Sequence, residues 1–80
     1  MQLKAIHHVA LICGDYARSR AFYVDLLGLR VIAETLRKER QSWKLDLALP
    51  EGGQLELFSF PDPPDRPSHP EAKGLRHLAF

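Results

Sequence analysis

The stretch IHHVALICGDYARSRAFYVDLLGLRV, residues 6 to 31, decides how the rest of the chain is interpreted. It overlaps an apolar run, KAIHHVALI (4–12), whose length and content of Ile, Val and Leu predict a strand. Asp15 then fits a helix N-cap, and the spacing of the apolar side chains that follow predicts a helix over 15–27. Gly28 fits the position just past a helix end, where a positive φ is common.

Three further strands are predicted after the helix. LRVIAETL (29–36) alternates well enough for a strand, and a charged connection, RKERQS, follows it. WKLDLAL (43–49) alternates more cleanly, with Trp and Leu side chains on one side and Lys, Asp and Ala on the other. A turn rich in Pro and Gly then leads to a last alternating run, QLELFSF (54–60). The order strand, helix, strand, strand, strand is a βαβββ module.

The rest of the chain reads as a connector followed by a new strand. Residues 61–73 hold five of the six prolines, a density that excludes regular helix or sheet. GLRHLAF (74–80) is again apolar, and its HLAF echoes the HVAL of the first strand. We therefore predict an α+β fold in three parts. These are a first βαβββ module (1–60), a proline-rich linker (61–73) and the first strand of an incomplete second module (74–80).

Composition narrows the class of protein. The 80 residues carry a formal net charge of +1, with 45% hydrophobic and 26% charged residues, which gives no electrostatic footprint for nucleic acid or for an anionic membrane. The start lacks the pattern of a secretory signal, and no apolar run has the length of a membrane span, so the cytoplasm is the expected location. The single Cys13 is expected to be a small buried hydrophobe.

Three residues interrupt apolar strands with groups that can bind a metal: His8, Glu56 and His77. Two imidazoles and one carboxylate suit a borderline divalent ion such as Zn, Ni, Co, Fe or Mn, and three ligands leave a position open for water or substrate. The alternatives to a metal site are that the histidines are hydrogen-bonded core residues and that Glu56 lies on a solvated face of the sheet. The run RKER is expected to be a solvated loop, although Arg37 or Arg40 could reach an anionic substrate.

The residues quoted at the outset resemble the opening of the vicinal-oxygen-chelate superfamily, which includes glyoxalase I and the fosfomycin and bleomycin resistance proteins. The shared signature is a His strand, an Asp at its exit, a helix with FY and LLG, and a returning strand. The similarity extends to short bacterial glyoxalase-I-like proteins over nearly the whole chain. It implies a site between two βαβββ modules in which His8, Glu56 and His77 are the metal ligands.

The same resemblance implies the function. It predicts a metal-dependent lyase or isomerase that acts on a thiol–aldehyde adduct such as a glutathione hemithioacetal, with Glu56 as the catalytic carboxylate. A fourth ligand, a Glu from the last strand of the second module, is absent from this sequence. The expectation is therefore a chain truncated after its first module, which in this form could lack activity.

Two other functions remain open on the sequence. One is an Fe(II) extradiol-type dioxygenase, and the other is a non-catalytic module that binds a small molecule or confers resistance. A homodimer, with strands exchanged between copies, is also expected because the apolar run RHLAF would otherwise present an unpaired edge.

Overall fold

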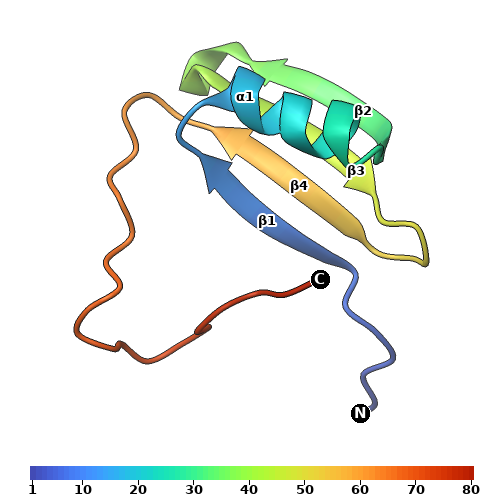
Figure 1. Cartoon of the computed structure of the whole chain (residues 1–80), viewed down its shortest axis with the longest axis vertical. Helices are drawn as coiled ribbons and strands as arrows, with labels where there is room; N and C mark the ends of the chain where they lie inside the picture. Colours follow the sequence, from blue (N-terminus) through green and yellow to red (C-terminus); the bar gives the residue numbers. More distant parts are fainter.

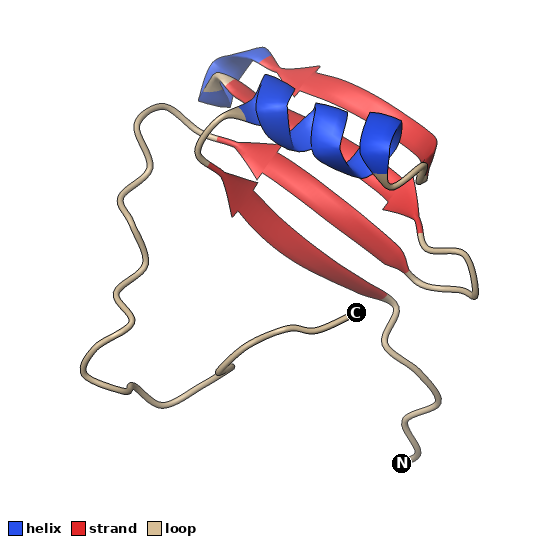
Figure 2. Cartoon of the chain, viewed as in Figure 1, coloured by secondary structure: helices blue, strands red, loops and turns tan.

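Four strands, one helical segment formed by α1 and η1, a short 3-10 helix and an irregular C-terminal segment make up the structure, a computed structural model that describes residues 1–80 (Figures 1 and 2). The elements, in chain order, are β1 (His8–Cys13), α1 (Tyr16–Arg20), η1 (Ala21–Leu26), β2 (Arg30–Arg37), η2 (Lys38–Arg40), β3 (Ser42–Ala48) and β4 (Gln54–Ser59). The strands form one sheet in the order β1-β4-β3-β2. The predicted α+β fold with a βαβββ order is thus confirmed.

The sheet is mixed, and its connections explain why. β2, β3 and β4 follow one another through short turns and pair antiparallel, as hairpins do. β1 instead pairs parallel with β4, because the helical segment carries the chain across the sheet before β2 begins. The first and last strands of the module therefore lie side by side, and β1 and β2 are the two edges.

The helical segment begins and ends as the sequence predicts. The Asp15 side chain accepts a hydrogen bond from the amide of Arg18 at 3.1 Å, which confirms it as the N-cap. Gly28 has a φ of 73°, so the residue past the helix end adopts the left-handed conformation that favours glycine. Within the segment, however, η1 is a π-helix, in which the Leu27 amide donates to the Phe22 carbonyl at 3.0 Å.

The helical segment lies over one face of the sheet (Figure 2), and its side chains pack against the core. The fully buried members of the core are four leucines of the β3–β4 hairpin, and Cys13 joins them at 8% exposure, as expected for a small buried hydrophobe. The core consists of Leu45, Leu47, Leu55, Leu57 and Cys13, with Val9, Leu11, Tyr16, Tyr23, Val24, Leu29 and Val31 packed against it. Because side chains alternate along a strand, the residues between these leucines face the other side of the sheet.

The predicted strand over 4–12 begins later than expected, at His8. The reason is that its partner strand, β4, starts only at Gln54, which is paired with His8. The residues before Gln54 form the turn between β3 and β4. One bond extends the pairing, from the Gln54 amide to the His7 carbonyl at 3.0 Å. Gly53, with a φ of 83°, fits closely there, since an added Cβ would lie 3.3 Å from the Ile6 carbonyl oxygen.

The strand predicted over 74–80 is not formed in this structure. A strand requires a hydrogen-bonded neighbour, and no backbone–backbone hydrogen bond joins any residue of 61–80 to the sheet. The segment is instead a long irregular excursion that returns below β1 (Figure 1). Within it, Arg66 Nη2 donates a hydrogen bond to the Leu75 carbonyl at 3.1 Å, and His69 forms an ion pair with Glu71. None of the helices has the length and apolar character to cross a membrane.

Candidate functional site

The face of the sheet opposite the helical segment, here called the open face, carries most of the polar side chains of the strands. We assign residues to the open face from the alternation of side chains along each strand and from the strand register. Its members are His8, Ala10, Ile12, Gln54, Glu56, Phe58, Ser42, Lys44, Asp46, Ala48, Arg30, Ala33, Thr35 and Arg37.

The structure brings two of the three predicted metal ligands together on this face. His8 Nε2 lies 3.7 Å from Glu56 Oε2, and the two residues come from the adjacent parallel strands β1 and β4. The Glu56 side chain is 14% exposed and that of His8 45% exposed. Ala10 is paired with Glu56, so a small side chain leaves space beside the carboxylate.

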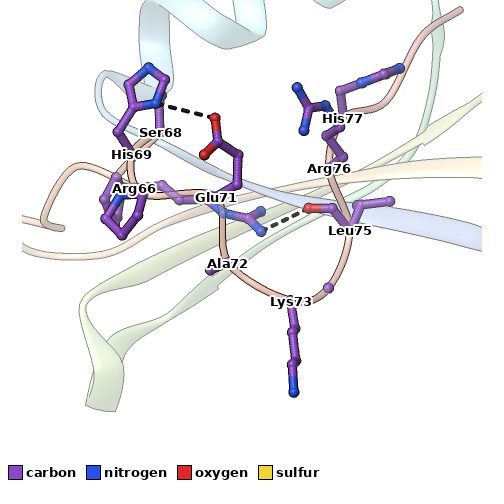
Figure 3. Close-up of a pocket in the computed structure, with 12 residues that line it drawn as sticks. Arg66, Ser68, His69, Glu71, Ala72, Lys73, Leu75, Arg76 and His77 are labelled. Atoms are coloured by element: carbon purple, nitrogen blue, oxygen red, sulfur yellow. Dashed lines mark hydrogen bonds and ion pairs between the residues drawn. The ribbon is translucent and has the colours of Figure 1, made fainter.

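The third predicted ligand, His77, does not join them. It is exposed and lies in the irregular C-terminal segment, where residues 66–77 surround a cavity of about 690 Å³. Figure 3 shows His77 across this cavity from the ion pair of His69 and Glu71, whose atoms are 3.5 Å apart. Its role as a ligand stays a prediction.

A carboxylate that the sequence interpretation missed lies next to Glu56. Asp46 of β3 is paired directly with Glu56, and Lys44 Nζ lies 3.1 Å from Asp46 Oδ1. The alternation of WKLDLAL already puts Lys44 and Asp46 on the side away from the leucines. The additional signal was the turn after β3, which fixes the hairpin register and so sets Asp46 beside Glu56.

An aromatic and cationic cluster occupies the end of the open face near the β2–β3 turn. The rings of Phe58 and Phe60 stack at 6.2 Å with an interplanar angle of 9°. The Arg37 guanidinium carbon lies 5.0 Å from the Phe58 centroid, and that of Arg40 lies 5.0 Å from the Phe60 centroid. Arg37 Nη2 also donates to the hydroxyl of the buried Ser42 at 2.9 Å. We call Arg37, Arg40, Phe58 and Phe60 the Arg–Phe cluster.

The residues with shifted pKa values, Tyr16, Arg20 and Glu34, lie together on the helix side of the sheet. Glu34 of β2 accepts hydrogen bonds from the Tyr16 hydroxyl and from Arg20 Nε, the latter at 2.8 Å. The bond from Arg20 holds the pKa of Glu34 below its usual value. Burial and the bond to Glu34 raise the pKa of Tyr16. These contacts link the helical segment to the edge strand β2.

The donors on the open face suit a divalent cation in kind but supply only part of a ligand set. An imidazole nitrogen and a carboxylate oxygen that face one another fit a borderline ion such as Zn or Ni. No three His, Cys, Asp or Glu side chains of residues 1–80 lie close enough together to hold a metal ion. His8 and Glu56 therefore fit a metal as two of its ligands, and a further donor has to join them.

Comparison with known proteins gives relatives over the whole chain. The chain is 64% identical over 80 residues to "Uncharacterized protein YwkD" of Bacillus subtilis (strain 168), and it covers 62% of that protein. It is 60% identical over 78 residues to "Uncharacterized protein YaeR" of Escherichia coli (strain K12), covering 60% of it. The chain thus spans about three-fifths of the length of these two relatives.

Solved structures share the fold. The crystal structure of SMU.1112c matches 99% of this chain with a TM-score of 0.86 and 49% identity, over 65% of its own length. A glyoxalase family protein from Enterococcus faecalis matches 100% of this chain, also with a TM-score of 0.86 and 49% identity, over 63% of its length.

A family model confirms the resemblance first suggested by the His strand, the Asp at its exit and the FY–LLG helix. It is the model of the Glyoxalase/Bleomycin resistance protein/Dioxygenase superfamily, and it matches residues 5–80. The match therefore covers both the module and the segment that contains His77. The chain belongs to the Glyoxalase/Bleomycin resistance protein/Dioxygenase superfamily.

Proposed function

We propose that the protein is a metal-dependent lyase or isomerase of the glyoxalase I type, which acts on a thiol–aldehyde adduct such as a glutathione hemithioacetal. The observation that carries this proposal is the approach of His8 Nε2 to Glu56 Oε2, 3.7 Å apart on the open face. These two donors come from positions that are 56 − 8 = 48 residues apart in sequence. Family membership supports the class of chemistry.

His77 is proposed as the third ligand because the family match includes it and few contacts hold its segment to the sheet. Residues 61–80 make no backbone hydrogen bond to the sheet, and the outer edge of β1 has no partner strand. Repositioning 74–80 therefore breaks little, and pairing with β1 would satisfy exposed backbone groups on both strands. The donor would come from the same chain or from a second copy.

The proposed roles follow from the position of each side chain. A divalent cation at this site would polarise oxygens of the adduct as a Lewis acid. His8 and Glu56 would hold it through the atoms that already face each other. Glu56 is the less exposed of the two, and in this proposal its carboxylate would accept and return a proton between adjacent carbons of the substrate. Lys44 and Asp46 border this position on β3.

Metal binding tests the ligand assignment directly. We expect isothermal titration with Zn²⁺ or Ni²⁺ to show an affinity at least about tenfold lower in His8→Ala, Glu56→Gln and His77→Ala than in the wild type. The matched control is His69→Ala, which removes an exposed imidazole from the same C-terminal segment. If His77→Ala behaves like His69→Ala, His77 is not a ligand. Turnover of methylglyoxal with glutathione, with either metal added, tests the reaction itself.

A second candidate is a metal-free module that binds a small molecule. The Arg–Phe cluster favours it, because stacked rings and a held guanidinium form a binding surface without any metal. Metal analysis of the purified protein separates the two functions. A stoichiometric divalent ion supports the lyase, whereas its absence together with retained small-molecule binding supports the binding module.

A further inference from the structure

Arg37 differs from every other cation in this chain. Of the 11 lysines and arginines, only three are partly withdrawn from solvent: Arg20, Arg37 and Lys44. Arg20 is paired with Glu34 and Lys44 with Asp46, each through an ion pair of 2.8 to 3.1 Å. Arg37 has no carboxylate partner, so its charge is partly desolvated and uncompensated.

The surroundings of Arg37 hold its guanidinium in place without neutralising it. One face of the group lies over Phe58 at 5.0 Å and near Phe60 at 5.8 Å, which favours a cation electrostatically. Nη2 is anchored by Ser42. Nε is buried and has no hydrogen-bond partner. A buried donor without an acceptor is unfavourable. Nε itself is screened from solvent, but Arg37 as a whole is only partly buried, so an anion would approach the guanidinium from its exposed side.

We propose that the Arg–Phe cluster is an anion-binding subsite for a carboxylate or phosphate group on the far end of the substrate. Arg37 supplies the held guanidinium, and Arg40, stacked 5.0 Å from Phe60, supplies a second charge at the exposed side. A guanidinium is suited to this because its planar set of donors matches a carboxylate or phosphate in two-point contact.

The location of the cluster specifies the kind of molecule. Phe58 follows Glu56 by two residues on the same face of β4, so the two positions are about 7 Å apart along the strand. A substrate whose reacting end lies at His8 and Glu56 would reach the cluster only if it is elongated and carries its anionic group at the other end. This assignment of the two ends rests on the proposed function, whereas the binding of the anion itself does not.

A purely structural role for Arg37 predicts something different. If the guanidinium served only to pack on the two rings and to bond Ser42, its nitrogen environment would be indifferent to added anions. The Nε–H group therefore gives a direct readout, because it is the buried donor without a partner. Its resonance can be followed in the metal-free 80-residue chain.

The experiment is a titration of the side-chain Nε–H signals of arginine in ¹H–¹⁵N spectra. Inorganic phosphate and acetate are added in separate series, with chloride adjusted to hold the ionic strength constant. We expect a saturable shift of the Arg37 signal, with Arg40 following and Arg30, exposed at the other end of β2, unchanged. Tighter binding of phosphate assigns a phosphate-bearing substrate, and tighter binding of acetate assigns a carboxylate. A shift that is linear and equal at Arg30 and Arg37 overturns the subsite.

Variants give a second readout. Arg37→Lys keeps the charge but loses the two-point donor set, and it should weaken anion binding by about fivefold or more, while Arg30→Lys leaves it unchanged. Arg40→Gln, at an exposed position, should weaken binding without altering the unfolding transition, which keeps the test valid if Arg37→Lys folds poorly. Equal effects of Arg30→Lys and Arg37→Lys would contradict the proposal. The anion titration uses the metal-free chain, so it is independent of the metal titration. If the anion binds saturably and the isothermal titration shows no binding of Zn²⁺ or Ni²⁺, the lyase proposal is rejected and the anion subsite stands.

Discussion

At the scale of single residues, the two faces of the sheet differ in whether their charged side chains have partners of opposite charge. On the helix side, Glu34 is compensated by Arg20 and by the Tyr16 hydroxyl, so its charge serves to join two elements. On the open face, Lys44 is paired with Asp46, but Glu56 has only His8 within ion-pair distance and Arg37 has no carboxylate partner. Charges that remain available on one face are the ones suited to bind a ligand.

The contact between Glu34 and Arg20 leads to a prediction on pH. The bond from Arg20 lowers the pKa of Glu34 in the folded state, so its stabilising contribution is complete above the ordinary glutamate pKa of about 4.3. That contribution is lost as the pH falls through the lowered pKa. In urea unfolding, the wild type should therefore exceed Glu34→Gln in midpoint at pH 7, and the difference should shrink below about pH 4.

Trp43 fluorescence provides the signal for this measurement, because its ring stacks on Tyr16 at 5.7 Å on the helix side. The matched control is Glu39→Gln, a change at an exposed position in η2. A gap between wild type and Glu34→Gln that is the same at pH 7 and pH 3 would contradict the assignment.

At the scale of elements, the sequence predicted those features that depend on neighbouring residues. The Asp15 cap, the Gly28 helix end and the alternation of β3 and β4 are all local, and all are confirmed. The start of β1 and the absence of a strand over 74–80 depend on partners remote in sequence, so local patterns could not fix them.

The candidate site divides in the same way. The sequence named His8 and Glu56, and the hairpin register could have added Asp46. The sequence could not predict the stacking of Arg37 on Phe58, because β2 and β4 are separated by β3 in the sheet and are not hydrogen-bonded neighbours. Arg37 was therefore expected in a solvated loop, whereas it lies at the end of β2 and is partly buried.

The two ends of the helical segment give a prediction on stability. Asp15→Ala removes the acceptor for the Arg18 amide and should lower the free energy of unfolding by about 1 kcal/mol. Asp15→Ser should lose only a few tenths, because Ser caps about as well. Gly28→Ala, at a φ of 73°, should cost about 1 kcal/mol through backbone strain. Chemical denaturation measures all three, and an Asp15→Ser variant as unstable as Asp15→Ala would reject the capping role.

At the scale of the whole molecule, the two edges of the sheet are not equivalent. β1 is a short, apolar edge whose Ile12 is 63% exposed, and it carries a proposed metal ligand. β2 is interrupted by a register shift between Val31 and Ala33, which disfavours pairing with another strand. A second copy, or the segment that carries His77, would accordingly add at β1.

We therefore expect the chain to sediment as a dimer at micromolar concentration, with β1 at the interface. Ile12→Lys places a charge on that edge and should shift the equilibrium toward monomer. Ile32→Lys, at a residue that is 42% exposed on the β2 edge, is the matched control and should leave the dimer intact. Analytical ultracentrifugation distinguishes the outcomes. A wild type that remains monomeric, or equal effects of the two changes, would contradict an interface at β1.

The parallel pairing of β1 with β4 has a consequence for the order of events during synthesis. Ala10 is paired with Glu56, so β1, which is synthesised before β4, cannot take its place in the sheet until β4 has emerged. Until then the β2–β3 hairpin and the helical segment offer no strand with which β1 pairs. The imidazole–carboxylate pair is consequently a late product of biogenesis, and a cation that captures it would select fully assembled molecules over partial ones.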